Sequence, residues 1–289
     1  MVSPKTERKE RKQMSNPIME KNPYFKNAGM RPNQMGQTTE YGFDYVDRYS
    51  PQGYREAQAD YAAPADTMTY ANAMNRTAVL LGVTLLSGIV TATLFPLSAL
   101  PPIAVFGSLA AFVAGIVIAL RRVIAAPLAV GYAVLEGVSL GALTRYVDVF
   151  LPGVALQAVI ATAIIVGVTL ALHYSGAVRT TPRGMKIALA AVFGAVIFSF
   201  VNMGFMWFGK TNMRTDITVM GLPLGVVIGV VMLLVAAYIL IGDFEAVQYA
   251  VENRAPENFG WTCAVGIVMT ILWIYVEVLR LVMILADNR

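Results

Sequence analysis

Two consecutive apolar segments decide the fold: GLPLGVVIGVVMLLVAAYILIGDFEAVQ at residues 221–248, and WTCAVGIVMTILWIYVEVLRLVMILAD at residues 261–287. Each has about the 20 apolar residues that a helix needs to cross a bilayer. Each also carries an acidic residue, Asp243 in the first and Glu277 in the second, and Arg280 follows Glu277 by three residues. A charge at the centre of a bilayer costs roughly 3 kcal/mol. We therefore expect both carboxyl groups to face a protein interior, a partner or water, and both are candidates for a functional site.

The composition of the whole chain agrees with a membrane protein. Hydrophobic residues make up 57% of the 289 residues, the mean hydropathy is +0.60, and only 14% of the residues are charged. Ordinary soluble domains contain about 25% charged residues. The net charge of +4 is spread over loops, so no basic surface predicts nucleic-acid binding. A single Cys263 and a single His173 provide too few ligands for a typical structural zinc site, and we expect no cofactor.

Upstream of the last two segments, five more apolar segments predict an all-α bundle of seven transmembrane helices. Turn residues separate them, among them Pro101, Pro152 and Pro182. The seven predicted spans are 77–95, 102–120, 126–146, 152–172, 186–208, 222–246 and 261–285. Residues 1–66 have no helical or alternating period, which predicts a disordered cytoplasmic tail, and residues 67–289 form the predicted transmembrane domain.

The lysines and arginines near the predicted spans indicate the orientation. If the N-terminus is inside, the inner side receives seven of them, namely Arg76, Arg121, Arg122, Arg179, Arg183, Lys186 and Arg254. The outer side receives five, namely Arg145, Lys210, Arg214, Arg280 and Arg289. The excess favours a cytoplasmic N-terminus and, with seven spans, a C-terminus outside.

Other polar residues inside the spans have two interpretations each. Glu136, in the third span, is either a buried neutral carboxyl group or part of an ion pathway. Asn202, in the fifth span, is either a contact between helices or a ligand, and the contact is favoured. Gly137 with Gly141, and Gly225 with Gly229, form GxxxG patterns that predict close helix packing.

The depth of the two acidic residues decides whether they can meet. A helix over 222–253 would be about 48 Å long, which exceeds the roughly 30 Å hydrocarbon core, so the end that carries Asp243 could protrude into the cytoplasm. Glu277 lies roughly 24 Å into the last span. The two carboxyl groups meet only if the helices are offset or tilted. Alternatively, Glu277 pairs with Arg280 within its own helix.

The chain resembles the Bax-inhibitor family, also called transmembrane Bax-inhibitor-motif proteins, and in particular its bacterial members. The segments AAYILIGDFEAVQ, WIYVEVLRLVMIL and IALRRVIAAPLAVGYAVLEGVSLGAL carry the resemblance. It implies a seven-helix bundle with the last helix in the centre, placed in the cytoplasmic membrane of a bacterium. It also implies a passive, pH-sensitive calcium leak that is governed by an acidic residue on each of the last two helices and by an arginine at the end of the second.

Residue by residue, the resemblance assigns Asp243 as the first acid and Glu277 as the second, at a position where other members carry aspartate. Arg121 matches the arginine, with Arg122 as the alternative. Two carboxyl groups in a low-dielectric site would share a proton, and its loss would create repulsion and expose oxygen ligands for a transient Ca²⁺ ion. The expected partners are thus the lipid bilayer, protons, calcium as the transported ion, and other membrane proteins.

Three other classes of protein fit parts of the sequence. A non-transporting membrane regulator that binds other membrane proteins during stress would use the carboxyl groups only structurally. A secondary transporter would require repeated broken helices in the two halves, and we find none that is clear. An intramembrane aspartyl protease would require a GxGD motif, whereas residues 240–243 read LIGD. We therefore expect a protein without enzymatic activity.

Overall fold

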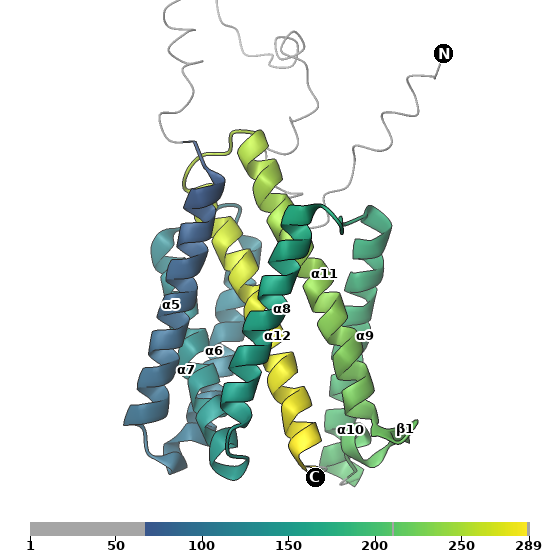
Figure 1. Cartoon of the computed structure of the whole chain (residues 1–289). Coiled ribbons are helices and arrows are strands. Elements are labelled where there is room, and N and C mark those ends of the chain that lie inside the picture. Colours follow the sequence, from purple (N-terminus) through teal and green to yellow (C-terminus); the bar gives the residue numbers. More distant parts are fainter. Residues whose placement is uncertain (1–66, 210, 288–289) are drawn as a thin grey trace, which may run out of the picture.

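The computed structural model describes residues 67–209 and 211–287. The prediction for the tail 1–66 lies outside these residues. Seven helices of the described part are long and apolar enough to span a membrane, as the sequence predicts (Figure 1). They are α5 (Tyr70–Leu94), α6 (Leu100–Leu120), α7 (Ala126–Phe150), α8 (Val154–Ser175), α9 (Pro182–Gly209), α11 (Leu224–Glu252) and α12 (Phe259–Asp287).

All seven helices are longer than the apolar segments that predict them. α5 begins at Tyr70, because Thr69 caps it by accepting a hydrogen bond of 3.1 Å from the backbone N–H of Asn72. α7 continues to Phe150 and α11 to Glu252. The helical period of residues 243–251 therefore does extend α11 past its apolar part, and Figure 1 shows this end of α11 projecting beyond its neighbours.

The segment between α9 and α11 contains short elements that the sequence analysis missed. They are α10 (Met213–Asp216) and the antiparallel strands β1 (Thr218–Val219) and β2 (Leu222–Pro223). A further short helix, η3 (Leu97–Ala99), precedes α6. Asn212 caps α10 by accepting from the N–H of Arg214. α10 packs against both α9 and α11, so it brings a charged residue, Arg214, next to the bundle.

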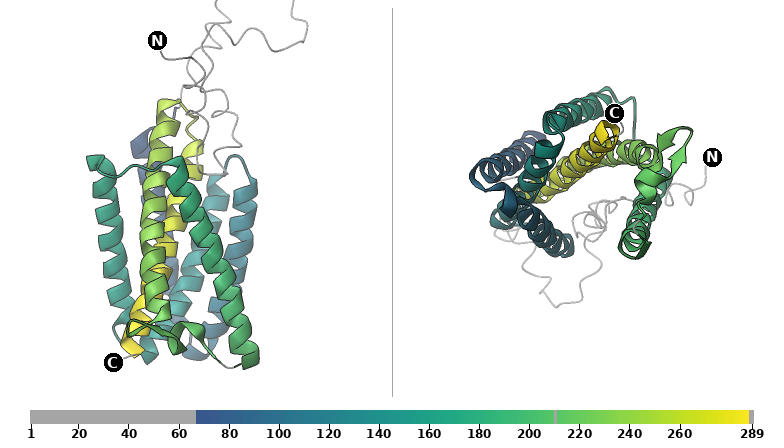
Figure 2. Two further views of the ribbon diagram at one scale, coloured as in Figure 1. Left: turned by 90° about the vertical axis from the view of Figure 1, so that its right-hand side faces the viewer. Right: turned by 90° about the horizontal axis from the view of Figure 1, so that it is seen from below.

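α12 is the central helix of the bundle. It packs against α5, α7, α8 and α11, and Figure 2 shows it between them when the bundle is seen from below. Half of its membrane window is buried, compared with 11% for α9. The expectation that the last helix is surrounded by the others is thus confirmed.

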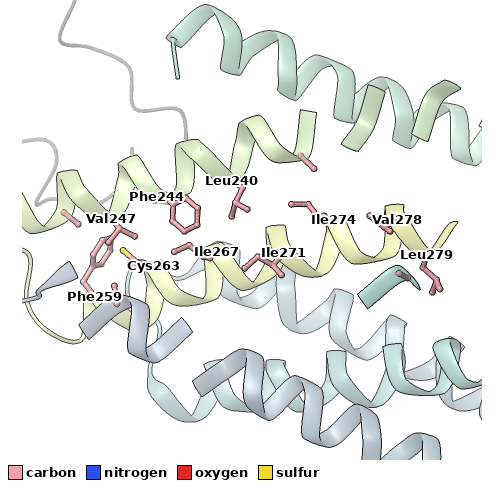
Figure 3. Packing of buried hydrophobic residues seen from close by; sticks show 14 of the residues in the cluster. Leu240, Phe244, Val247, Phe259, Cys263, Ile267, Ile271, Ile274, Val278 and Leu279 are labelled. Carbon is pink, nitrogen blue, oxygen red and sulfur yellow. The ribbon is translucent and has the colours of Figure 1, made fainter. Parts of the chain in front are cut away.

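The main hydrophobic core lies along the contact between α11 and α12. Figure 3 shows Leu240 and Phe244 of α11 facing Ile267, Ile271 and Ile274 of α12. All five side chains are buried. In lipid, the stability of such helix contacts comes mainly from close packing, because the surrounding lipid tails are as apolar as the side chains. This core fixes the height of α11 relative to α12, and with it the partners of their polar residues.

The glycine patterns act as predicted, through close packing. A Cβ atom at Gly141 would lie 2.3 Å from the carbonyl oxygen of Gly88 on α5, and one at Gly137 would lie 1.9 Å from Ser87 Oγ. At Gly229 a Cβ atom would lie 2.5 Å from Leu281 Cδ2 of α12. These glycines allow α5 to approach α7, and α11 to approach α12.

Candidate functional site

Asp243 lies at the contact between α11 and the central helix. Thr270 of α12 donates a hydrogen bond of 2.6 Å to Asp243 Oδ2. The Thr270 hydroxyl also lies 3.3 Å from the carbonyl oxygen of Gly266, one turn earlier on α12. Thr270 is buried and Asp243 is partly buried. The carboxyl group that the sequence singles out is thus held inside the bundle by a hydroxyl group of the neighbouring helix.

Glu277 lies deeper along α12 and has a different partner. Its side chain is almost fully buried, and its Oε2 atom pairs with Arg280 Nη2 at 2.5 Å. The pairing within the helix, which the sequence allowed as an alternative, is therefore the one observed. The other oxygen, Oε1, is buried and has no hydrogen-bond partner.

The structure does not bring the carboxyl groups of Asp243 and Glu277 together. Asp243 is level with Thr270, and Glu277 follows Thr270 by seven residues, a rise of about 10 Å along α12. On α11, Gly229 lies beside the Glu277 side chain, since a Cβ atom there would lie 3.4 Å from Glu277 Oε1. Gly229 precedes Asp243 by fourteen residues, or about 21 Å. The expected contact is absent because the packing of α11 on α12 places Asp243 and Glu277 at different heights along the bundle.

Arg121 and Arg122 are exposed at the end of α6. The following loop is attached to α12 by a hydrogen bond of 3.0 Å from the N–H of Ile124 to Thr262 Oγ1. Thr262 precedes Thr270 by eight residues, about 12 Å of helix. Within the described residues, no salt bridge joins Arg121 to either acid. The structure thus places the predicted arginine at the rim of the bundle rather than beside Asp243.

Glu136 and Asn202 have local partners. Tyr132, one turn earlier on α7, donates a hydrogen bond of 2.8 Å to Glu136 Oε1. Asn202 is buried on α9 and accepts a hydrogen bond of 2.8 Å from the N–H of Met213, at the start of α10. It also donates to Asn212 Oδ1 at 3.3 Å. Asn202 therefore connects α9 to the segment that contains α10, which agrees with the favoured interpretation of a contact between helices.

Two residues of this region were missed by the sequence analysis. Thr270 was overlooked because a single threonine in an apolar helix most often bonds its own backbone. The sequence did offer one signal for Thr270. It precedes Glu277 by seven residues, and this spacing places both residues on one face of α12. Arg214 was counted only as a charge in a loop. It lies close enough to Arg280 and Glu277 for their charges to act on it, and only the folding of α10 against the bundle brings it there.

The carboxyl groups of the described residues are scattered rather than clustered. Among the described residues, no group of three or more His, Cys, Asp or Glu side chains gathers in one place. A Ca²⁺ ion takes six to eight oxygen ligands, of which Asp243 and Thr270 could supply two or three.

The chain was compared with protein families and with curated proteins. The family model described as "Bax inhibitor 1 like" matches residues 16–287. No curated protein matches the chain. The matched residues include all seven membrane-spanning helices, with both Asp243 and Glu277. The chain therefore belongs to the Bax inhibitor 1-like family of membrane proteins.

Proposed function

We propose that this protein is a pH-sensitive calcium leak of the membrane, in which Asp243 is the titrating group. The supporting observation is the hydrogen bond of 2.6 Å between Thr270 and Asp243, at the contact of the central helix with α11. On the orientation expected from the sequence, with the N-terminus in the cytoplasm of a bacterium, this contact lies nearer the cytoplasmic end of the bundle.

The position of Asp243 makes its ionised form costly. Thr270 lies eleven residues, about 17 Å of helix, from the start of α12. The contact is thus within the spanning part of the central helix. The residues that follow Asp243 and Thr270 in the chain, Phe244 and Ile271, have buried side chains that belong to the main hydrophobic core. A carboxylate in such an apolar setting is stable only with water, hydrogen bonds or a cation around it.

Protonation of Asp243 would therefore control the contact. At low pH the neutral carboxyl group keeps its bond to Thr270, and α11 stays packed on α12. At higher pH the carboxylate attracts water and a hard cation into the contact, and the cation moves on because the site offers few oxygen ligands. Glu277 takes no part in this step, since Arg280 already neutralises it at 2.5 Å.

The experiment is Ca²⁺ entry into proteoliposomes between about pH 6 and pH 8, a range in which buried carboxyl groups can titrate. We expect the leak of the wild-type protein to increase with pH. The variant Asp243→Asn carries a permanently neutral group and should lose most of this dependence. Glu277→Gln and Glu136→Gln, which neutralise carboxyl groups elsewhere in the bundle, should keep it.

Two results would change the proposal. If Glu277→Gln and Asp243→Asn both abolish the pH dependence, the two carboxyl groups act as one unit in spite of their separation in this structure. If the wild-type protein shows no Ca²⁺ flux at any pH, the proposal of a calcium leak is wrong. A non-transporting regulator that binds other membrane proteins then becomes the better explanation.

A further inference from the structure

The loop between α8 and α9, residues 176–181, is hydrogen-bonded to α11. The Glu245 side chain of α11 accepts two hydrogen bonds from Thr180, one of 3.0 Å from the backbone N–H and one from the hydroxyl. Tyr238, two turns earlier on α11, accepts a hydrogen bond of 2.8 Å from the N–H of Thr181. Figure 2 (left) shows this loop crossing α11, with α12 behind. We call residues 176–181 the strap.

The strap lies on the side of α11 that faces away from the central helix. Tyr238, Gly242 and Glu245 are spaced by four and three residues, so they share one face of α11. Leu240 and Asp243 contact α12, and at 3.6 residues per turn they lie about half a turn around α11 from that face. A movement of α11 away from α12 would therefore press against the strap.

The strap is packed tightly on α11. A Cβ atom at Gly242 would lie 2.7 Å from Met185 Cε and 3.4 Å from Thr180 Cγ2. A Cβ atom at Gly184, in the first turn of α9, would lie 2.3 Å from the Tyr238 hydroxyl oxygen. At its other end the strap continues from α8, which packs against α12 as well as α11. The strap thus connects the outer side of α11 to a helix that is fixed on the central one.

Two other titratable or charged side chains lie near Glu245. His173 of α8 is buried, with its ring centre 5.4 Å from that of Phe244, and the charges of Glu245 and Arg179 act on it. Within the described part of the chain, no salt bridge joins Glu245 to His173 or Arg179. The two donors of Thr180, rather than an ion pair, therefore hold the Glu245 carboxylate.

We infer that Glu245 is a positioning residue of the leak: it fastens the strap across α11 and so keeps α11 on α12 until Asp243 ionises. The inference rests on the proposed function, because the step that it controls is the opening of the contact between Asp243 and Thr270. Hydrogen bonds to a carboxylate are stronger than those to a neutral acceptor. Weakening the bonds to Thr180 should therefore make the opening easier.

The first test needs no ion flux, because the chain contains its own probe. Cys263 is the only cysteine, and its buried side chain belongs to the core between α11 and α12, together with Phe244 and Val247 (Figure 3). A thiol reagent should reach it when α11 moves away. At one fixed pH in an uncharged detergent, we expect Glu245→Gln and Thr180→Val to be labelled about threefold to tenfold faster than the wild-type protein, which is the effect of losing one hydrogen bond on an equilibrium. Equal rates would contradict the inference.

Two controls separate the strap from general loosening of the bundle. Glu252→Gln, which changes an exposed glutamate at the end of α11, should be labelled at the wild-type rate. Ala133 of α7 is fully buried in a second core cluster, built from α5, α6, α7 and α12. In a chain with Ala133→Cys and Cys263→Ala, adding Glu245→Gln should leave the labelling rate unchanged. Faster labelling at position 133 would mean that Glu245 stabilises the whole bundle, and the inference would be wrong.

The second test is the pH profile of Ca²⁺ entry into proteoliposomes. Because opening is linked to the ionisation of Asp243, easier opening should move the pH of the half-maximal leak downward, by up to about one pH unit for a tenfold effect. Thr180→Val leaves the charges of Glu245, His173 and Arg179 in place, so we expect it to shift the profile in the same direction as Glu245→Gln. A shift in Glu245→Gln alone would mean that the lost charge acts on Asp243 directly, and would overturn the role of the strap.

The two tests distinguish this inference from the proposed function. A wild-type protein without Ca²⁺ flux would contradict the leak, and the labelling of Cys263 would still decide whether Glu245 holds α11 on α12. A wild-type leak with unchanged Cys263 labelling in both Glu245→Gln and Thr180→Val would leave the leak in place and refute the strap.

Discussion

Thr270 on the central helix donates a hydrogen bond of 2.6 Å to Asp243 on α11, whereas Glu277 lies two turns further along α12 and pairs with Arg280. The carboxyl group at the contact between the two helices thus has a hydroxyl partner. A hydroxyl can donate to a carboxylate and can also accept from a protonated carboxyl group, so Thr270 can bond Asp243 in either protonation state. In the proposed mechanism it is the water and the cation attracted by the carboxylate, not loss of this hydrogen bond, that open the contact.

Replacing Thr270 by valine keeps the shape of the side chain and removes the hydroxyl. The hydroxyl stabilises the ionised form of Asp243 by about 1.5–3 kcal/mol, which corresponds to about one to two pH units. Ionisation then becomes more costly, so the pH at which the calcium leak is half-maximal should move upward by about that amount. Ca²⁺ flux in proteoliposomes measures it.

A suitable control is Thr169→Val on α8, since the hydroxyl of Thr169 donates to its own helix, at 2.7 Å from the carbonyl oxygen of Ile165. That variant should keep the wild-type profile. A Thr270→Val profile identical to the wild-type one would mean that the hydroxyl does not act on Asp243.

Gly141→Ala should destabilise the contact between α5 and α7. The added methyl group would lie 2.3 Å from the carbonyl oxygen of Gly88, a backbone atom that cannot move without shifting α5. Overpacking of this kind costs about 1–3 kcal/mol, and thermal unfolding in detergent should show a lower melting temperature. Gly167→Ala is the matched control, because a Cβ atom there meets nothing within 4 Å. Equal melting temperatures for the two variants would contradict the close packing of α5 on α7.

Glu257 holds the loop between α11 and α12 against the start of α5. It pairs with Arg76 and accepts from Asn72 Nδ2 at 2.9 Å. Next to this pair, the N–H of Met68 donates to the carbonyl oxygen of Ala255 at 2.9 Å. The Glu257 side chain is 36% exposed, so losing the ion pair should lower the overall stability by less than about 1 kcal/mol.

The local effect should be larger than the global one. We expect Glu257→Gln to speed hydrogen exchange of the Met68 amide while the melting temperature changes little. Glu252→Gln, a substitution of an exposed glutamate at the end of α11, is the control and should alter neither. Unchanged protection of Met68 in Glu257→Gln would show that the backbone bond holds the loop by itself.

The orientation can be tested by labelling single cysteines in intact cells after replacing the buried Cys263. Ala177 lies in the α8–α9 loop and Met220 in the turn between β1 and β2, at opposite ends of the bundle, and both are exposed. With the N-terminus inside, a membrane-impermeant reagent should label Met220→Cys and spare Ala177→Cys. The reverse pattern would invert the predicted topology.

The sequence by itself determined the features that depend on local composition. The length of an apolar segment decides whether it spans the membrane, so all seven helices could be found. The spacing of Glu277 and Arg280 allowed their pairing within one turn. The GxxxG patterns likewise indicated where helices approach closely, because the absence of a side chain is itself the cause of that packing.

Only the tertiary structure decided which polar residues of different helices meet. The partner of Asp243 depends on the height of α11 relative to α12, and this height follows from how Leu240 and Phe244 pack against the isoleucines of α12. A sequence gives the depth of each residue within its own helix, but not the offset between two helices. In the same way, Arg214 comes close to Glu277 only because α10 folds back against α9 and α11. Both arrangements depend on contacts between segments that are far apart in the chain, for which local pattern carries no information.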